Sequence, residues 1–422
     1  MTIIQEQAHR LVTSTLDTLQ PLIRQRTEAL VPQLAKVLDA FAGENIGTQH
    51  FASLTGYGHG DQGRNAIDRV FARVLGAKQA AVRLQFVSGT HAIAAAMFGV
   101  LRPGNRLLSV TGRPYDTLER VIGLQRDDQG SLIDFDIRYD EIPLTPQRVI
   151  DNRALDHALD EPCHMVLIQR SCGYDWRPGL TIAAIADVCE RVHRRQPSCV
   201  CLVDNCYGEL VEHQEPSEVG ADLVAGSLIK NLGGTITPTG GYVAGRTDLV
   251  GRACCRLTAP GIGSEGGTGF DLHRLVLQGL FLAPQMVTEA LIAADLTAAV
   301  FQQLGYPVQP SPGFERGHLV QAVRLGSLDA VKVVCRAFQA SSPIGAYLDP
   351  IPASMPGYAT ELIMAGGTFI DGSTSEFSAD APLCSPYDLY IQGATHHTHV
   401  RIALERALTA LAEASLVDLP TN

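Results

Sequence analysis

The sequence has little charge and few aromatic residues: only 18% of its 422 residues are charged and 6% are aromatic, with a single tryptophan. Disordered chains combine low hydrophobicity with high charge, whereas 45% of this chain is hydrophobic. We therefore expect a folded chain with a large core or two domains. The formal net charge is −11. Because nucleic acids and anionic membranes are bound by clustered Lys and Arg, this balance argues against both as partners.

Other absences narrow the setting. The ten cysteines form no pair of C-x-x-C motifs, and the first residues, MTIIQEQAHR, lack a basic segment followed by an apolar one. We expect free thiols and a cytoplasmic location. No apolar run approaches the roughly 20 residues of a membrane helix, so no membrane span is expected. No G-x-G-x-x-G motif follows the first predicted strand, which argues against a nicotinamide-dependent enzyme.

Hydrophobic periodicity divides the chain into three parts. Residues 1–50 predict a helical arm, broken at Pro21 and Pro32 and ending at Gly43. Residues 51–290 begin with a glycine-rich loop and then alternate strand-like and helix-like runs, which predicts an α/β domain with a mostly parallel sheet. Residues 291–422 predict a smaller α+β domain at the C-terminus.

Polar residues follow three predicted strands of the α/β part. Ser88, Gly89 and Thr90 stand where a strand turns into a helix, so the helix N-terminus and two hydroxyls can bind an anion. Asp204 ends the run CLVD, and Lys230 follows the next strand, in GSLIKN. We expect partial burial to depress the pKa of Lys230. In open parallel sheets, ligands bind beyond the carboxyl ends of strands, so these groups are expected to meet.

Each of these features alone has an ordinary interpretation: a Ser or Thr helix cap, a turn carboxylate, a solvated lysine. Together they match pyridoxal 5′-phosphate, which needs a phosphate site, an acid for its pyridine nitrogen and a lysine for its aldehyde. The order phosphate site, Asp204 and then Lys230 is that of fold type I enzymes. The sequence therefore predicts this cofactor.

Several stretches along the chain match one known family: GYGHGDQGR, SGTHAI, IQRSCGY, GSLIKNLGG, RLTAPGIGSEGG, QGLFLAPQ, MPGY and GGTFIDGS. With them the chain resembles the aluminium-resistance or methionine gamma-lyase-like branch of the Cys/Met-metabolism pyridoxal-phosphate enzymes. The resemblance covers nearly the whole chain. It implies fold type I, the aspartate aminotransferase-like fold, with a large α/β domain and a smaller α+β domain.

The resemblance implies a role for each matched residue. Lys230 would bind the cofactor aldehyde as the Schiff-base lysine, Asp204 would pair with the pyridinium, and Tyr115 would stack on the ring. Tyr57 and Arg64 would reach the phosphate of a neighbouring subunit, which implies a homodimer or homotetramer with shared active sites. The phosphate ligands would be Ser88, Gly89, Thr90 and Ser227.

The chain departs from the family pattern at several positions. Ile229 stands where a hydroxyl residue usually precedes the lysine, and Cys172 where a basic residue is frequent. The cluster His396, His397 and His399 is a further departure. No acidic residue lies near it in sequence, so we expect no metal there.

The substrate carboxylate needs a cationic partner. Arg401 lies roughly where the superfamily keeps its carboxylate-binding arginine, although it could instead pair with Glu405 one helical turn away. Arg401 is slightly favoured, and Arg170 and Arg113 are its rivals.

The implied activity is β- or γ-elimination with C–S cleavage on a small sulfur-containing or activated amino acid. Lys230 would move the α-proton and Tyr115 would supply a proton to the leaving group. β- or γ-Replacement in a biosynthetic pathway is the close alternative, and both stay open at this point. A non-catalytic metal-tolerance binding protein is a remote alternative, because a pure binder has no need of Asp204 and Lys230 at matched strand ends.

Overall fold

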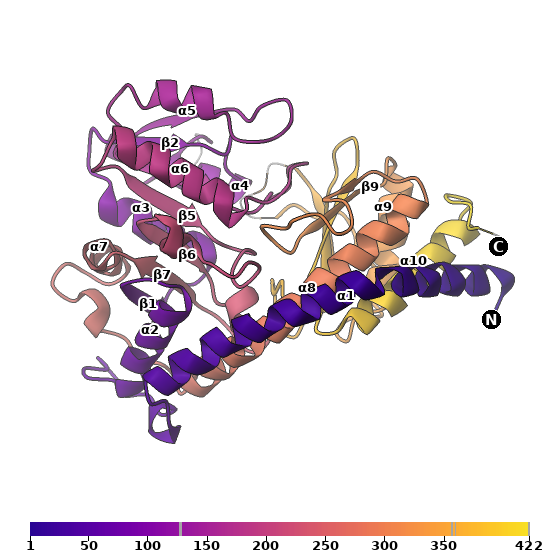
Figure 1. Cartoon of the computed structure of the whole chain (residues 1–422), viewed down its shortest axis with the longest axis horizontal. Helices are drawn as coiled ribbons and strands as arrows, with labels where there is room; N and C mark the ends of the chain where they lie inside the picture. Colours follow the sequence, from indigo (N-terminus) through magenta and orange to yellow (C-terminus); the bar gives the residue numbers. More distant parts are fainter. Residues whose placement is uncertain (126–128, 356–357, 359, 421–422) are drawn as a thin grey trace.

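The chain forms two lobes that are joined along one side by two long helices (Figure 1). This computed structural model describes residues 1–125, 129–355, 358 and 360–420. Pro356 and Gly357, from the stretch MPGY, lie outside the described residues.

The N-terminal arm is a single helix, α1 (Ile3–Gly43), which begins with a capping box at Thr2. The predicted breaks at Pro21 and Pro32 are wrong, because the helix continues through both prolines. Both prolines are exposed, and so are Asp17 and Glu28, the residues four positions earlier whose carbonyls lose their helical partner. Water can bind those carbonyls, which makes the two prolines tolerable.

The large lobe is built on a seven-stranded sheet that is mostly parallel, as the sequence predicts. Only β7 runs antiparallel to its neighbours, β1 and β6. In spatial order the strands are β1 (Gln79–Arg83), β7 (Gly241–Gly245), β6 (Leu223–Ser227), β5 (Val200–Asp204), β4 (Met165–Gln169), β2 (Arg106–Ser109) and β3 (Arg138–Glu141).

Helices cover both faces of this sheet and bury a separate core on each. One core includes residues of α2 and α6, and the other includes residues of α3 and α7. The helices of this lobe are α2 (Gln62–Val74), α3 (Gly89–Val100), α4 (Asp116–Ile122), α5 (Asn152–Ala158), α6 (Ile182–Arg195) and α7 (Thr247–Leu257). Short 3-10 turns lie at Thr48–His50, Ile133–Phe135, Pro216–Val219, Asn231–Gly233 and Gly263–Glu265.

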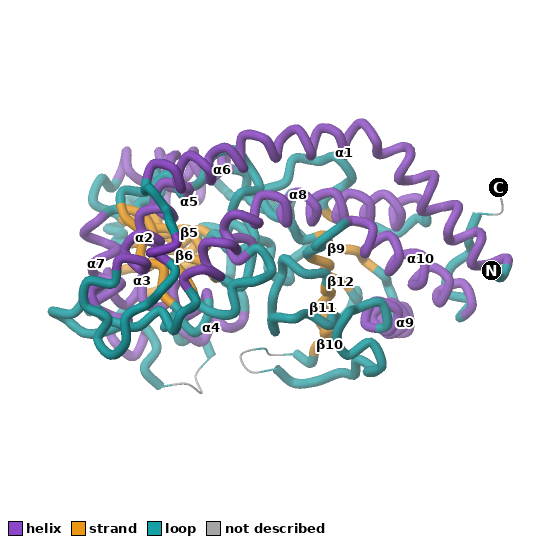
Figure 2. Tube along the Cα trace, turned by 90° about the horizontal axis from the view of Figure 1, so that it is seen from below, coloured by secondary structure: helices purple, strands orange, loops and turns teal. Residues whose placement is uncertain are grey.

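The small lobe is an antiparallel five-stranded sheet packed against helices α9 (Leu328–Gln339) and α10 (His397–Glu413) (Figure 2). In spatial order its strands are β10 (Leu362–Ala365), β11 (Ser378–Pro382), β12 (Asp388–Gln392), β9 (Gln321–Arg324) and β8 (Val308–Gln309).

Helix α8 (His273–Gln303) runs beside α1 through both lobes (Figures 1 and 2). The part up to Leu291 packs into the large-lobe core, and the part from Ala293 packs into the small-lobe core. We propose this point as the boundary between the two domains. Contrary to the expectation from sequence, α8 is long and apolar enough to span a membrane. However, 67% of its most apolar window is buried inside the protein, as in a core helix.

Candidate active site

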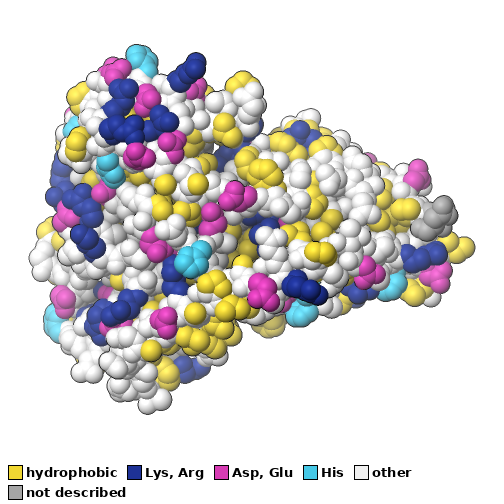
Figure 3. All heavy atoms as spheres, in the orientation of Figure 1, with side chains coloured by type: hydrophobic (Ala, Val, Ile, Leu, Met, Phe, Trp, Pro, Cys, Tyr) yellow, Lys and Arg dark blue, Asp and Glu magenta, His cyan; other side chains and the backbone are white. Residues whose placement is uncertain are grey.

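A cavity of about 220 Å³ lies where the carboxyl ends of β5 and β6 face the small lobe. The surface is hollowed between the two lobes in Figure 3. Seven of the residues predicted from the sequence line this one cavity: Ser88, Gly89, Thr90, Tyr115, Asp204, Ser227 and Lys230. The parallel register places Asp204 beside Gln169 of β4 and Ala225 of β6, so the strand ends meet at one edge.

One end of the cavity is the N-terminus of α3. Ser88 is its N-cap, and its Oγ accepts a hydrogen bond of 3.1 Å from the His91 backbone N–H. Gly89 is closely packed, because a Cβ there would lie 3.1 Å from Cys206 Sγ and 3.1 Å from Ser227 Cβ, a tight fit. Thr90 Oγ1 lies 3.4 Å from the hydroxyl of Tyr115. This end combines hydroxyls with a helix dipole, which suits an anion.

Lys230 and Asp204 face the cavity from two different strand ends. The Lys230 Nζ lies 3.7 Å from the centroid of the Tyr207 ring, a cation–π contact. The Oδ1 of Asp204 accepts a hydrogen bond of 3.1 Å from the backbone N–H of Cys206. Burial raises the pKa of Asp204, whereas the nearby Lys230 ammonium lowers it.

The expected depression of the Lys230 pKa is wrong for the chain without cofactor. Burial does lower the pKa of this amine, but Cys206, Tyr207, Asp204 and Tyr115 favour the ammonium, and the net pKa lies well above its ordinary value. Without cofactor, Lys230 is therefore an ammonium.

Tyr115 lies between the phosphate end and Asp204. It precedes α4, and its backbone N–H donates to Gln169 Oε1 at 3.2 Å. Burial, followed by the charge of Asp204, raises the pKa of its phenol well above the ordinary value. The phenol therefore keeps its proton at neutral pH and can donate it.

Sequence reasoning missed an aromatic wall made by Tyr174, Tyr207, Tyr358 and Tyr390, all of which line the cavity. The Tyr390 hydroxyl donates to the Tyr174 carbonyl at 2.6 Å, and the Tyr174 hydroxyl donates to Asp380 Oδ2 at 3.1 Å. Burial raises the pKa of Asp380 to about 6. Tyr207 stands three residues after Asp204, and Tyr174 and Tyr358 end the family stretches IQRSCGY and MPGY, whereas Tyr390, on β12 of the small lobe, carried no such signal in the sequence.

None of the described residues that line this cavity is an arginine. Arg401 lies on α10, where its guanidinium donates to Glu405 at 2.9 Å and to Thr13 at 2.9 Å. Arg170 is fully buried and binds Asn205 and Glu212. Arg113 pairs with Glu119 but lines a neighbouring cavity that shares Tyr115 and Tyr174 with the first.

Tyr57 and Arg64, the two residues predicted to reach a neighbouring subunit, differ in their exposure to solvent. Tyr57 is 81% exposed and stacks on His59 with ring centroids 5.5 Å apart. Arg64 is buried in its own chain, where it donates to the carbonyls of Gly58 and Gly267. Neither residue lines the cavity of this chain.

The histidine cluster has an acidic neighbour that the sequence did not reveal. Glu289, from α8, accepts from the backbone N–H of His397 at 2.9 Å and lies 2.7 Å from its Nδ1. His396 stacks on His397, and His399 Nε2 bonds instead to the Ser341 carbonyl. No carboxylate is close to these histidines in the sequence, but the fold brings Glu289 next to His397.

The two remaining departures from the family pattern are both close to the site. Ile229 lines the cavity itself. Cys172 is buried against Tyr390, and burial raises the pKa of its thiol to about 12, so it is an unreactive neutral thiol.

Known proteins with similar sequences and structures point to one family. The family model for methionine gamma-lyase matches residues 8–412. The uncharacterized protein YnbB of Bacillus subtilis (strain 168) is 42% identical over 383 residues, which are 90% of this chain and 91% of that protein. A carbon-sulfur lyase involved in aluminum resistance from Clostridium novyi NT has a similar structure, with a TM-score of 0.92, 40% identity and 96% of each chain covered. L-methionine gamma-lyase of Pseudomonas putida is 27% identical over 237 residues, 56% of this chain and 52% of that enzyme.

The residues at the cavity fit pyridoxal phosphate. A lysine amine, a buried carboxylate and hydroxyls at a helix N-terminus are the donors that its aldehyde, ring nitrogen and phosphate require, and Gly89 leaves the room for close approach. With the match over residues 8–412, this site places the chain in the methionine gamma-lyase family of pyridoxal-phosphate enzymes.

Proposed function

We propose that this protein is a carbon–sulfur lyase that eliminates a sulfur leaving group from the β- or γ-carbon of a small amino acid. The observation that carries the proposal is the meeting of Lys230, Asp204 and the N-terminus of α3 in one cavity. The carbon-sulfur lyase of Clostridium novyi NT, which shares the fold at 40% identity, supports the reaction type.

Pyridoxal phosphate, when bound, supplies an aldehyde for amino groups and a ring that accepts electrons from the α-carbon of the substrate. Asp204, buried at the end of β5, would pair with the ring nitrogen and favour its protonated, electron-poor form. Lys230 would hold the aldehyde with its Nζ, and the same nitrogen is placed to take the α-proton of the substrate. Tyr207, 3.7 Å below that nitrogen, keeps it over the cavity.

The leaving thiolate needs a proton, and Tyr115 is the proposed donor. Its raised pKa keeps the phenol protonated, and its hydroxyl lies at the cavity, 3.4 Å from Thr90 Oγ1. The wall of Tyr174, Tyr358 and Tyr390 excludes water and offers apolar faces to a thioether. We propose Arg113 as the partner of the substrate carboxylate, since its cavity adjoins the first one at Tyr115.

We further propose a dimer or tetramer with shared sites and a cytoplasmic location. The exposed Tyr57 in the glycine-rich loop supports the shared site, because a large aromatic side chain that is 81% exposed is suited to a subunit interface. The ten free thiols support a reducing compartment.

The reaction is tested by incubating the purified holoenzyme with a panel of sulfur amino acids and measuring 2-oxo acid and ammonia. Release of both, lost in Lys230→Ala together with covalent cofactor attachment, is expected. Amino transfer that depends on 2-oxoglutarate as the only activity contradicts the proposal. Adding a thiol nucleophile tests the alternative: if substituted amino acid forms much faster than 2-oxo acid, the protein is a replacement enzyme.

A further inference from the structure

A second cluster of reactive side chains lies at the opposite end of the strands from the cavity. Cys201 is the second residue of β5, and Asp222 immediately precedes β6. His193 lies in the last turn of α6, which packs over this edge. Three residues of an extended strand span roughly 10 Å, so this cluster is separate from the site at Asp204.

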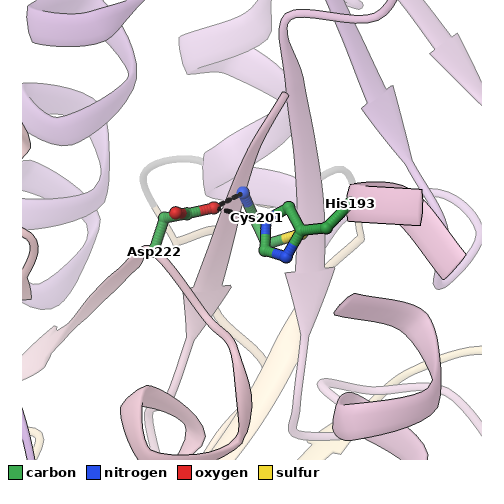
Figure 4. Close-up of side chains that lie close together, drawn as sticks. All are labelled: His193, Cys201 and Asp222. Atoms are coloured by element: carbon green, nitrogen blue, oxygen red, sulfur yellow. Dashed lines mark hydrogen bonds and ion pairs between the residues drawn. The ribbon is translucent and has the colours of Figure 1, made fainter. Parts of the chain in front are cut away.

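The three side chains point at one another (Figure 4). Asp222 Oδ2 lies 2.9 Å from His193 Nε2 and accepts a second hydrogen bond of 2.9 Å from the backbone N–H of Cys201. The His193 nitrogen, the Cys201 sulfur and an Asp222 oxygen all lie within 4.8 Å of one another. Ligands around a tetrahedral zinc ion are roughly 3.3–3.8 Å apart, given bonds of 2.0–2.3 Å. Small side-chain shifts would therefore bring the three ligand atoms to the spacing that a zinc ion requires.

A second thiol lies on the same helix. Cys189 precedes His193 by four residues, so both lie on one face of α6, but its sulfur is not among the three ligand atoms that lie within 4.8 Å of one another. A thiol, an imidazole and a carboxylate are a soft-to-borderline donor set, which suits Zn²⁺ and disfavours hard ions such as Al³⁺ or Mg²⁺.

The surroundings of the cluster also fit a metal ligand set. Arg246 donates to the other oxygen of Asp222, Oδ1, at 3.2 Å and so leaves Oδ2 for an ion; ligating carboxylates are usually held by such outer hydrogen bonds. The His193 side chain is 32% exposed, so an ion has access and water can accept the proton that His193 carries on Nδ1 when Nε2 is a ligand.

The cluster of Glu289, His396 and His397 is a weaker candidate for the same ion. It has no thiol. His396 Nδ1 already accepts from the Thr398 backbone N–H as a helix cap. This second cluster is explained by capping, and it provides a matched control.

We propose that His193, Cys201 and Asp222 bind one Zn²⁺ ion per chain, with water in the fourth position. Binding releases the Cys201 thiol proton to solvent and joins α6 to β5 and β6 at the edge of the sheet remote from the cavity. The expected consequence is a more stable large lobe rather than a change in the reaction, since only the folded chain presents all three ligands together.

The test uses the holoenzyme stripped with a chelator and titrated with ZnCl₂ against a chromophoric chelator. One Zn²⁺ per chain is expected, with a rise in melting temperature and with sulfur in the first coordination sphere by X-ray absorption. His193→Gln, at a partly exposed position, should weaken Zn²⁺ binding at least about tenfold. Cys201→Ala should remove the sulfur signal. AlCl₃ should not displace the Zn²⁺.

His397→Gln, in the second cluster, should leave the Zn²⁺ affinity unchanged. The proposal is overturned if the wild-type protein takes up less than stoichiometric Zn²⁺, if His193→Gln binds as tightly as wild type, or if His397→Gln is the variant that loses the ion. Because His193→Gln leaves the β5 core intact, loss of folding in Cys201→Ala alone does not affect the conclusion.

Discussion

At the residue scale, the site depends on a few charges held in a largely aromatic cavity. Lys230 is the only cation among the described residues that line it, and Asp204 the only carboxylate. Both side chains are buried away from bulk water, so each is stabilised by the other before cofactor and substrate bind. Because Lys230 binds the cofactor, the cation that pairs with the substrate carboxylate is expected at the edge of the cavity.

That requirement separates the candidate arginines. Arg113→Ala is expected to raise KM for the amino-acid substrate about tenfold or more with a smaller change in kcat, because a lost ion pair weakens substrate binding. Arg401→Ala should leave both constants nearly unchanged, since Arg401 binds Glu405 and Thr13 away from the cavity. Steady-state kinetics check both. The reverse pattern would restore Arg401 as the substrate ligand.

Asp380 gives a prediction on stability. Its folded-state pKa of about 6 lies above the ordinary 3.8, so the folded chain binds the extra proton and stability falls as pH rises from about 4 to 6. Asp380→Asn keeps an acceptor for Tyr174 and Gln392 but carries no charge. We expect a gain of about 1–3 kcal/mol in unfolding free energy at pH 7 that vanishes below pH 4.

Urea unfolding of both proteins between pH 4 and 8 measures this difference. Asp349→Asn is the control, because that exposed carboxylate pairs with Arg336, which lowers its pKa. It should show no gain at pH 7. A pH-independent difference for Asp380→Asn would refute the assignment.

At the scale of the element, α1 contains two helix-breaking residues in a continuous helix. Pro21→Ala restores a backbone N–H that can donate to the carbonyl of Asp17, at an exposed position. We expect a stabilisation of about 1–2 kcal/mol, which is the helix propensity gained less the greater entropy of the unfolded chain. Thermal unfolding measures it, with activity unchanged. A lower melting temperature would show that the ring of Pro21 makes packing contacts that outweigh the hydrogen bond.

Some strands and strand-end side chains could be predicted from the sequence, and others could not. Apolar runs ended by Asp204 and Ser227 predicted buried parallel strands and the side chains at their ends, because strand direction alone brings such ends together. The strand Ser378–Pro382 was missed, since SADAP has neither β-branched residues nor alternation. The contacts of Tyr174 with Asp380 and of Glu289 with His397 join residues more than 100 positions apart. No local pattern encodes them.

At the scale of the whole molecule, the proposed shared site predicts complementation between subunits. Neither Lys230→Ala nor Tyr57→Ala should be active alone if Tyr57 completes the partner's site. After the two variants are unfolded together and refolded, half of the dimers are hybrids, and each hybrid regains one complete site. We expect about a quarter of the wild-type activity per chain. Recovery of no activity, or a Tyr57→Ala variant with full activity, would show that each subunit works independently.

Helices α1 and α8 lie side by side and each packs into the cores of both lobes. Two adjacent rods crossing a joint resist bending far more than a single loop hinge does. The cleft between the lobes is therefore expected to keep nearly the same width whether it is vacant or filled. We expect substrate selection to depend on the fixed shape of this cleft rather than on closure of one lobe against the other.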